Sequence, residues 1–179
     1  TAILVAAGPA MATVQPNLVA SRTSGPAPLG IFFDASGTTS SAVTDSFRQV
    51  LYTFDFGDGE TGTWTNGTPK GTVAGGPLGA HVYKNPGTYT VTLVANDGVS
   101  SRQTTMTVTV INPDTFYSGK TICVSTDGST GWGPAGATYT TTIPDLTYTT
   151  TMSGYRLLFK RGQDFSSNAA SAFSVTTNL

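Results

Sequence analysis

Three carboxylates, Asp55, Asp58 and Glu60, lie within a six-residue stretch and form a candidate cation site. Clustered carboxylate oxygens are the ligands that hard cations prefer, so this spacing predicts a calcium site. The competing interpretation is that Asp55 and Asp58 accept hydrogen bonds from the backbone amides of a turn. We favour the turn, because no complete D-x-D-x-D-G loop surrounds the three residues.

Nucleophilic catalysis has little support, because the chain has one histidine, His81, and one cysteine, Cys123. A nucleophile needs an activating partner, and we expect His81 to be a structural hydrogen-bonding residue and Cys123 a buried thiol. Residues 57–62 match G-x-G-x-x-G, but the acidic Asp58 and Glu60 within them would repel phosphate. We therefore expect no catalytic residue, no enzymatic activity, and no cofactor other than the candidate calcium ion.

Three aromatic residues, Trp132, Tyr139 and Tyr148, are candidates for a surface that contacts a protein partner or stacks on a glycan. Trp132 lies in the segment Gly131-Trp-Gly-Pro134, which predicts a flexible, exposed loop. The alternative for such residues is packing within a core, where large aromatic side chains are largely buried.

The composition indicates which elements would position these residues. Only 11% of the residues are charged, against about 25% in an ordinary soluble domain, and Thr supplies much of the polarity. Branched Thr suits strands better than helices. The net charge of −1 and the pI near 5.6 produce no long-range field for nucleic acid or anionic lipid. The apolar run in residues 1–12 is too short to span a bilayer.

Apolar and polar residues alternate with period two in 50–56, 88–95 and 105–110, which predicts strands with one face on a core. Asn96-Asp-Gly98 between two such segments predicts a hairpin. About six or seven strands are expected between residues 17 and 111, which fits a β-sandwich. We expect an all-β chain with an N-terminal docking arm (1–12), a sandwich (13–112), a linker (113–118) and a smaller β-rich unit (119–179).

Three blocks of the first unit resemble the PKD (polycystic kidney disease) domain family. Its opening strands are similar to Ser24–Leu29 and Phe32–Gly37. Its W-D-F-G-D-G signature resembles Phe54-Asp-Phe-Gly-Asp-Gly59, with Phe54 in place of Trp, and its later motifs resemble His81-Val-Tyr83 and Pro86–Leu93. The resemblance covers residues 13–112. It implies an immunoglobulin-like sandwich that acts as a spacer, adhesive or interaction module.

The second unit resembles the start of a right-handed parallel β-helix in three segments, Lys120–Ser125, Pro134–Ala137 and Arg156–Phe165. Gln163 interrupts the R-G-D-x-F ending found in that class. A β-helix needs several stacked coils, and this segment has room for one or two. We expect the unit to be incomplete on its own, with neighbouring subunits or chain beyond Leu179 completing it.

These features favour a non-enzymatic structural or adhesive module of a larger assembly, and we expect a phage virion surface protein such as a capsid decoration, head fibre or spike. The expected partners are proteins, as a homo-oligomer or a virion shell, with a glycan as a further candidate and no nucleic acid. The alternative is the non-catalytic N-terminal part of a secreted bacterial polysaccharide-active enzyme, or a cell-surface adhesin, located outside the cell or on the bacterial surface.

Overall fold

The computed structural model describes residues 13–60, 62, 63, 65, 67, 70–141 and 154–165. The chain forms two compact units, Thr1–Asn112 and Pro113–Leu179. The expected arm 1–12 and Tyr148 lie outside the described residues. The segment predicted as a linker, 113–118, opens the second unit with the short helix α2 (Pro113–Phe116).

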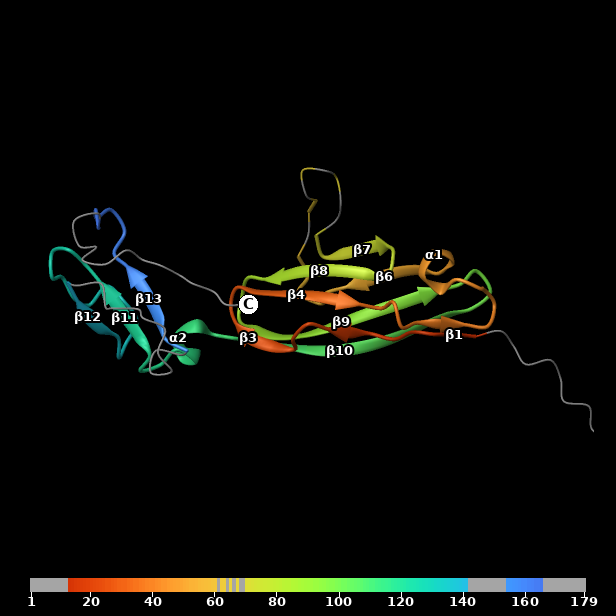
Figure 1. Cartoon of the computed structure of the whole chain (residues 1–179), viewed down its shortest axis with the longest axis horizontal. Helices are drawn as coiled ribbons and strands as arrows, with labels where there is room; N and C mark the ends of the chain where they lie inside the picture. Colours follow the sequence, from red (N-terminus) through yellow and green to blue (C-terminus); the bar gives the residue numbers. More distant parts are fainter. Residues whose placement is uncertain are drawn as a thin grey trace, which may run out of the picture. The chain divides into compact units, whose positions relative to one another are not determined.

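Two sheets form most of the first unit, and Figure 1 shows their strands lying along one common axis. The larger sheet pairs five strands in the order β3 (Ser24–Pro26), β10 (Ser101–Ile111), β9 (Gly87–Asn96), β6 (Leu51–Asp55) and β7 (Thr72–Gly75). The smaller sheet pairs β2 (Val19–Ala20), β4 (Leu29–Asp34) and β8 (Leu78–Tyr83). A separate pair joins β1 (Val14–Gln15) to β5 (Thr39–Ser40), and α1 (Ser46–Gln49) precedes β6.

The core lies between the two sheets and follows the alternation predicted from the sequence. In β9 every second residue from Val91 is fully buried, and β6 buries Tyr52 and Phe54 in the same way. The core consists mainly of aromatic and branched side chains: Val14, Leu29, Ile31, Phe33, Val50, Tyr52, Phe54, Phe56, Tyr83, Val91, Leu93, Val108 and Val110. The predicted immunoglobulin-like sandwich is confirmed.

The predicted hairpin at Asn96-Asp-Gly98 joins β9 to β10, and Asp97 fixes it. Its Oδ1 accepts hydrogen bonds from the N–H groups of Val99 and Ser100, at 2.9 and 2.6 Å. The Ser40 hydroxyl donates to Oδ2 at 2.6 Å, which ties β5 to the hairpin. These bonds, the one from Ser40 first and then the one from the Ser100 N–H, lower the pKa of Asp97 to about 2.

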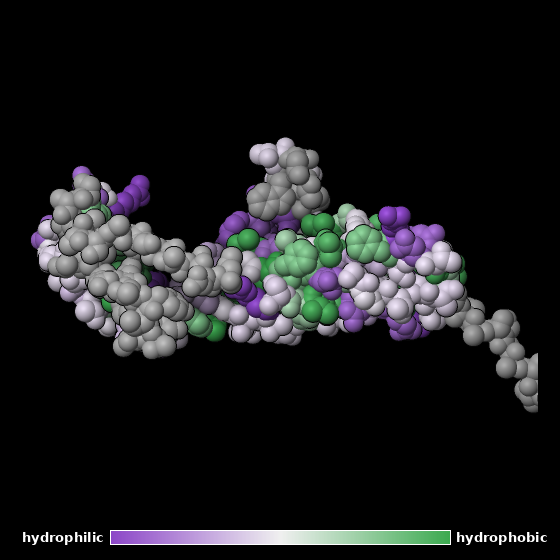
Figure 2. All heavy atoms as spheres, in the orientation of Figure 1, coloured by the Kyte–Doolittle hydropathy of each residue, from purple (hydrophilic) through white to green (hydrophobic). Residues whose placement is uncertain are grey.

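The outer surface of the smaller sheet is mainly hydrophobic, with Asp34 as a charged residue between Val19 and Leu78. Figure 2 shows hydrophobic residues gathered over the region where β4 and β8 lie in Figure 1. Since successive side chains of a strand point to opposite faces, the residues that alternate with the core face outward here. We call the following five exposed residues the apolar face: Val19, Phe32, Leu78, Ala80 and Val82.

A three-stranded parallel sheet follows α2 in the second unit. It contains β11 (Thr121–Val124), β12 (Thr138–Thr140) and β13 (Arg156–Phe159), in the order β12-β11-β13. β11 buries Cys123 and Val124, as expected for a central strand. Lys160 supports the end of β13, with Nζ 2.8 Å from Asp127 Oδ2.

The strand order does not show the expected β-helix. Both strand pairs are parallel, as they are in a β-helix. In successive stacked coils, however, the first strand would lie at an edge, whereas β11, the first of the three in the chain, lies in the centre. The described residues therefore support a small parallel β unit, and the β-helix remains undemonstrated.

Candidate functional site

The carboxylate cluster lies in the tight turn that follows β6. Asp55 Oδ1 accepts a hydrogen bond from the Gly57 N–H at 2.9 Å, and Asp58 Oδ1 accepts one from the Glu60 N–H at 3.1 Å. Gly57 has a φ of 74°, and a Cβ at this position would collide with the carbonyl oxygen of Thr90. The turn therefore requires glycine here. Both aspartates bond turn amides, which is the interpretation that the sequence favoured.

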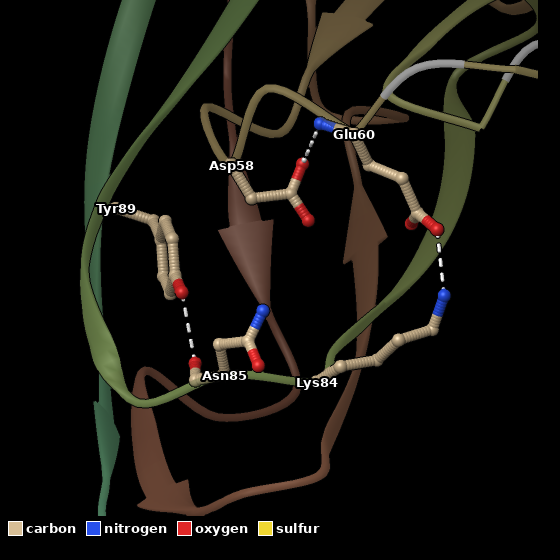
Figure 3. Close-up of a pocket in the computed structure, with 5 residues that line it drawn as sticks. All are labelled: Asp58, Glu60, Lys84, Asn85 and Tyr89. Atoms are coloured by element: carbon tan, nitrogen blue, oxygen red, sulfur yellow. Dashed lines mark hydrogen bonds and ion pairs between the residues drawn. The ribbon is translucent and has the colours of Figure 1, made fainter.

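A polar pocket of about 170 Å³ adjoins this turn, and its lining residues are Asp58, Glu60, Lys84, Asn85 and Tyr89 (Figure 3). Lys84 Nζ lies 2.6 Å from Glu60 Oε1, and the Tyr89 hydroxyl donates to the carbonyl oxygen of Asn85 at 2.8 Å. The pocket is smaller than the roughly 300–1,000 Å³ of small-molecule sites. Its charged groups Glu60 and Lys84 already pair with each other, so nothing in its lining indicates an organic ligand.

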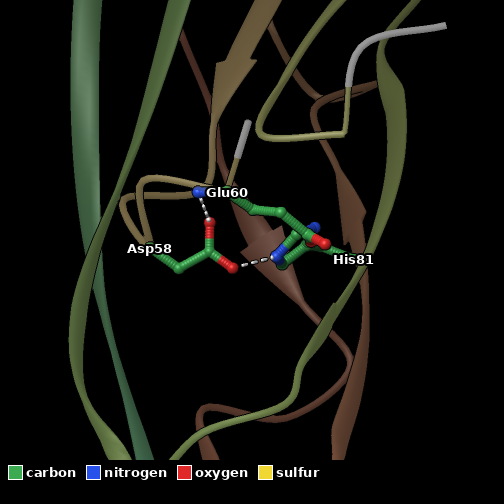
Figure 4. Close-up of side chains that lie close together, drawn as sticks. All are labelled: Asp58, Glu60 and His81. Carbon is green, nitrogen blue, oxygen red and sulfur yellow. Dashed lines mark hydrogen bonds and ion pairs between the residues drawn. The ribbon is translucent and has the colours of Figure 1, made fainter. Parts of the chain in front are cut away.

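His81 extends from β8 to the same turn and hydrogen-bonds Asp58 (Figure 4). Its Nε2 lies 2.7 Å from Asp58 Oδ2, and because a carboxylate accepts, the imidazole donates. The side chains are 3% and 12% exposed, so water has little access to the bond. The ring also stacks on Phe56 at 4.4 Å and meets Tyr83 edge-on at 4.7 Å. His81 thus has the structural role predicted for it.

Two ionisable groups of this region, Asp58 and Tyr83, have opposite pKa shifts. Burial by itself would raise the pKa of Asp58, but the hydrogen bonds from His81 and from the Glu60 N–H outweigh burial and lower it. Burial raises the pKa of the Tyr83 phenol, whose O–H donates to the carbonyl oxygen of Phe56 at 2.9 Å. At neutral pH Asp58 is therefore ionised and Tyr83 protonated, and neither is poised for proton transfer.

The residues that come close enough to share a metal ion are Asp58, Glu60 and His81, each with one ligand atom within 4.8 Å of the others. Asp55, the third residue of the sequence-based site, is outside this group among the described residues. Calcium takes six to eight oxygen ligands, whereas this group offers two carboxylates and an imidazole that are already bonded to Lys84 and to one another. The turn therefore remains the interpretation we favour, and the calcium site remains the alternative to it.

A contact between His81 and Asp58 could not be read directly from the sequence, because 23 residues separate them. The one signal was the joint presence of the F-D-F-G-D-G and H-x-Y motifs, which the structure brings together through the packing of β8 beside the turn after β6.

Trp132 and Tyr139 pack against each other in the second unit. Their ring centroids lie 5.9 Å apart in an edge-to-face arrangement. Trp132 Nε1 donates to the carbonyl oxygen of Ser129 at 3.1 Å, and the Tyr139 hydroxyl accepts from the Gly133 N–H at 2.9 Å. Trp132 lies in a loop, as predicted, but its side chain is half-buried and bonded, so the predicted exposure is wrong.

The described residues contain no pairing of His81 with a nucleophile. Its Nε2 bonds a carboxylate, and Cys123 lies in the other unit. Cys123 is buried, and burial raises the pKa of its thiol, although Arg156 opposes the shift. A raised thiol pKa disfavours the nucleophilic thiolate. Neither of the described helices, at four residues each, has the length to cross a bilayer.

Comparison with known protein families finds the model for the PKD domain, which matches residues 16–110. A search of curated proteins found no match.

Solved structures resemble the first unit. One, described as carbohydrate-binding modules of the β-sandwich superfamily with promiscuous specificity, is 27% identical over 58% of this chain, with a TM-score of 0.42. This chain covers 36% of that structure's length. The PKD1 domain of the Vibrio cholerae metalloprotease PrtV is 22% identical, with 53% of this chain and 93% of that one covered and a TM-score of 0.35. The PKD1 domain of Vibrio anguillarum Epp is 20% identical, with 56% of this chain and 95% of that one covered and a TM-score of 0.37.

Proposed function

Because the chain belongs to the PKD domain family through residues 16–110, we propose that it is a structural or adhesive module without catalytic activity in a larger assembly, displayed on a virion surface. PKD domains are non-catalytic modules of extracellular and cell-surface proteins. Within this proposal, the module is a capsid decoration, a head fibre or a spike.

The observation that carries the proposal is the apolar face. Its large side chains, Val19, Phe32, Leu78 and Val82, are each 47–55% exposed. With Ala80 they form a group of exposed apolar residues on one face of the sheet, and a contiguous apolar patch on a monomer is often functional. A depression lies beside Phe32 and Gly30 on this face, so the surface is not flat. A protein partner that covers the face would remove this surface from water.

The low charge of the chain supports the same proposal. With 11% charged residues and a net charge of −1, the surface provides little electrostatic repulsion between neighbouring molecules. Such a surface suits a chain that stands close to other subunits. The turn after β6 adds support, since the hydrogen bonds of its ionisable groups stabilise the fold.

Density-gradient fractionation of particles from the chain's source tests the proposal. We expect the wild-type chain to co-sediment with virions and the Phe32→Asp variant to lose most of this association. Thr105→Asp, an exposed strand position on the larger sheet, is the matched control and should co-sediment like wild type. A wild-type chain found free of every particle fraction would refute the proposal.

The glycan-binding alternative makes a different prediction in the same material. An adhesin or the front part of a polysaccharide-active enzyme would fractionate with cell envelopes or culture medium and bind a glycan array. Binding lost in Trp132→Ala and kept in Phe116→Ala, an exposed aromatic of the same unit, would favour that alternative.

A further inference from the structure

β8 is an edge strand of the smaller sheet. It pairs with β4 on one side, and the sheet order β2-β4-β8 places no described strand on the other. Among the described residues, no backbone hydrogen bond joins residues 78–83 to a segment other than β4. An unpaired strand edge presents a row of N–H and C=O groups that can accept another strand.

The pairing of β4 fixes which groups of β8 point outward. The Ser21 N–H donates to the carbonyl oxygen of Phe32 at 2.8 Å, so the backbone groups of Phe32 point toward β2. The next residues along β4, Ile31 and Phe33, therefore point toward β8, where their partners are His81 and Gly79. It follows that the N–H and C=O groups of the alternate residues, Leu78, Ala80 and Val82, point to the open side.

This edge lacks the features that usually keep edge strands apart. Natural edges carry charges, Pro or bulges that prevent pairing. Residues 78–83, Leu-Gly-Ala-His-Val-Tyr, contain neither Pro nor an acidic or permanently charged side chain, and the nearest such residues are Pro77 and Lys84 at its two ends. Its six residues are regularly paired with β4 without a bulge.

The residues whose backbone groups point to the open side, Leu78, Ala80 and Val82, are spaced symmetrically about Ala80, so this edge can pair with a second copy of itself. In an antiparallel pair with its two-fold axis at Ala80, Ala80 lies opposite its own copy, and Leu78 lies opposite Val82 in both directions. All three positions then exchange backbone hydrogen bonds. The side chains on this surface form apolar cross-strand pairs, which stabilise a sheet. The inward positions pair Gly79 with His81, so a residue without a side chain faces the bulkier ring.

We propose that β8 pairs antiparallel with β8 of a second copy of this chain, which joins two three-stranded sheets into a continuous six-stranded sheet. This inference rests on the proposed function and names one protein partner of the module. The apolar faces of the two copies then adjoin across the new pair, as an isologous contact requires.

Charge and the self-complementary spacing of Leu78, Ala80 and Val82 favour a second copy over an unrelated strand. The edge offers no charged residue by which to select a different partner, and the net charge of −1 leaves two copies with little mutual repulsion. The larger sheet has five strands and the smaller one three, so an added strand beside β8 extends the narrower layer. One edge pair buries less than the roughly 800 Å² per partner of a standard interface, so we expect a weak, concentration-dependent dimer.

Disulfide cross-linking of the whole chain tests the register. Opposite residues that exchange backbone hydrogen bonds have Cα atoms about 5.5 Å apart, within the range that a disulfide spans. Under mild oxidation, Ala80→Cys should form a covalent dimer. Leu78→Cys and Val82→Cys should cross-link when mixed and far less when each is alone. The buried Cys123 makes wild type a silent control, and Thr105→Cys controls for random collision. Equal cross-linking of Ala80→Cys and Thr105→Cys would overturn the proposal.

Sedimentation velocity tests the pairing without a covalent bond. Wild type should shift from monomer toward dimer as its concentration rises. Ala80→Glu places like charges opposite each other and should abolish the shift, and Thr105→Glu should keep it. Ala80→Pro removes an N–H that points away from β4, so it should also stay monomeric while its circular dichroism remains that of wild type. A wild-type monomer at every concentration, or a dimer unaffected by Ala80→Glu, contradicts β8 pairing.

The outcomes separate this inference from the proposed function. A chain that associates with virions but does not dimerise through β8 refutes the inference alone. A chain that dimerises through β8 yet is found on no particle refutes the proposed function alone.

Discussion

Removal of the His81 imidazole should destabilise the sandwich strongly, because this ring joins β8 to the turn after β6. In His81→Leu the carboxylate of Asp58, 12% exposed, loses its bond at 2.7 Å. A hydrogen bond to a charged group contributes about 1.5–3 kcal/mol. The lost stacking on Phe56, at 4.4 Å, adds about 0.5–1.5 kcal/mol. We expect a total loss of about 3 kcal/mol in the free energy of unfolding.

A double-mutant cycle isolates the bond from the packing. Urea unfolding at pH 7 of wild type, His81→Leu, Asp58→Asn and the double variant should give a coupling energy of about 1.5–3 kcal/mol. The neighbouring pair Lys84 and Glu60, with Lys84 60% exposed, is the matched control. Its cycle, Lys84→Ala with Glu60→Gln, should give at most about 1 kcal/mol. A His81–Asp58 coupling no larger than that of the control would refute the reasoning.

The sign of the pH dependence follows from the lowered pKa of Asp58. A carboxyl group with a folded pKa below its unfolded value, about 3.9, stabilises the fold above that value and stops doing so as the pH falls through the folded pKa. His81→Leu removes part of this contribution. The stability gap between wild type and His81→Leu should therefore narrow as the pH falls below about 4.

Three further predictions concern the turn, the hairpin and calcium. Gly57→Ala should cost about 2 kcal/mol or more in urea unfolding, since its Cβ would strike the Thr90 carbonyl, while Gly59→Ala, with φ of 65° but open space, should cost about 1 kcal/mol. The unfolded pKa of Asp is about 4 and the folded pKa of Asp97 is about 2, so wild type should lose stability as the pH falls between these values. Asp97→Asn should flatten this loss. An unchanged stability profile in Asp97→Asn would contradict the bonds assigned to Asp97. Excess calcium should leave Tm unchanged, because the carboxylates are already bonded; a rise that disappears in Glu60→Gln would instead establish the calcium site.

The sandwich could be predicted because its signals are local. Strands β6, β9 and β10 each alternate with period two, so their buried residues follow from the chain itself. The turn after β6 was predictable from the spacing of Gly57, Asp58 and Gly59. The family motifs supplied what alternation alone lacks, namely that these strands form one immunoglobulin-like domain.

The candidate surfaces were harder to predict because they depend on which face of a strand is covered. Phe32 and Phe33 are adjacent and identical in type, yet Phe33 is fully buried and Phe32 is 47% exposed. The packing of the smaller sheet against the larger one decides between them, because it covers the face that carries Phe33. The open edge of β8 likewise depends on strand order and not on the composition of residues 78–83. In the second unit, the central position of β11 arises from pairing with strands on both sides, and short Thr-rich segments carry no signal for that order.

Immunogold electron microscopy of particles from the chain's source, with an antibody against the native chain, tests an assembly role most directly. If the chain is a virion surface module, gold should decorate intact virions at regular positions, and particles carrying the Phe32→Asp variant should show little label. Intact virions without label, together with the chain recovered only as free protein, would contradict a virion role.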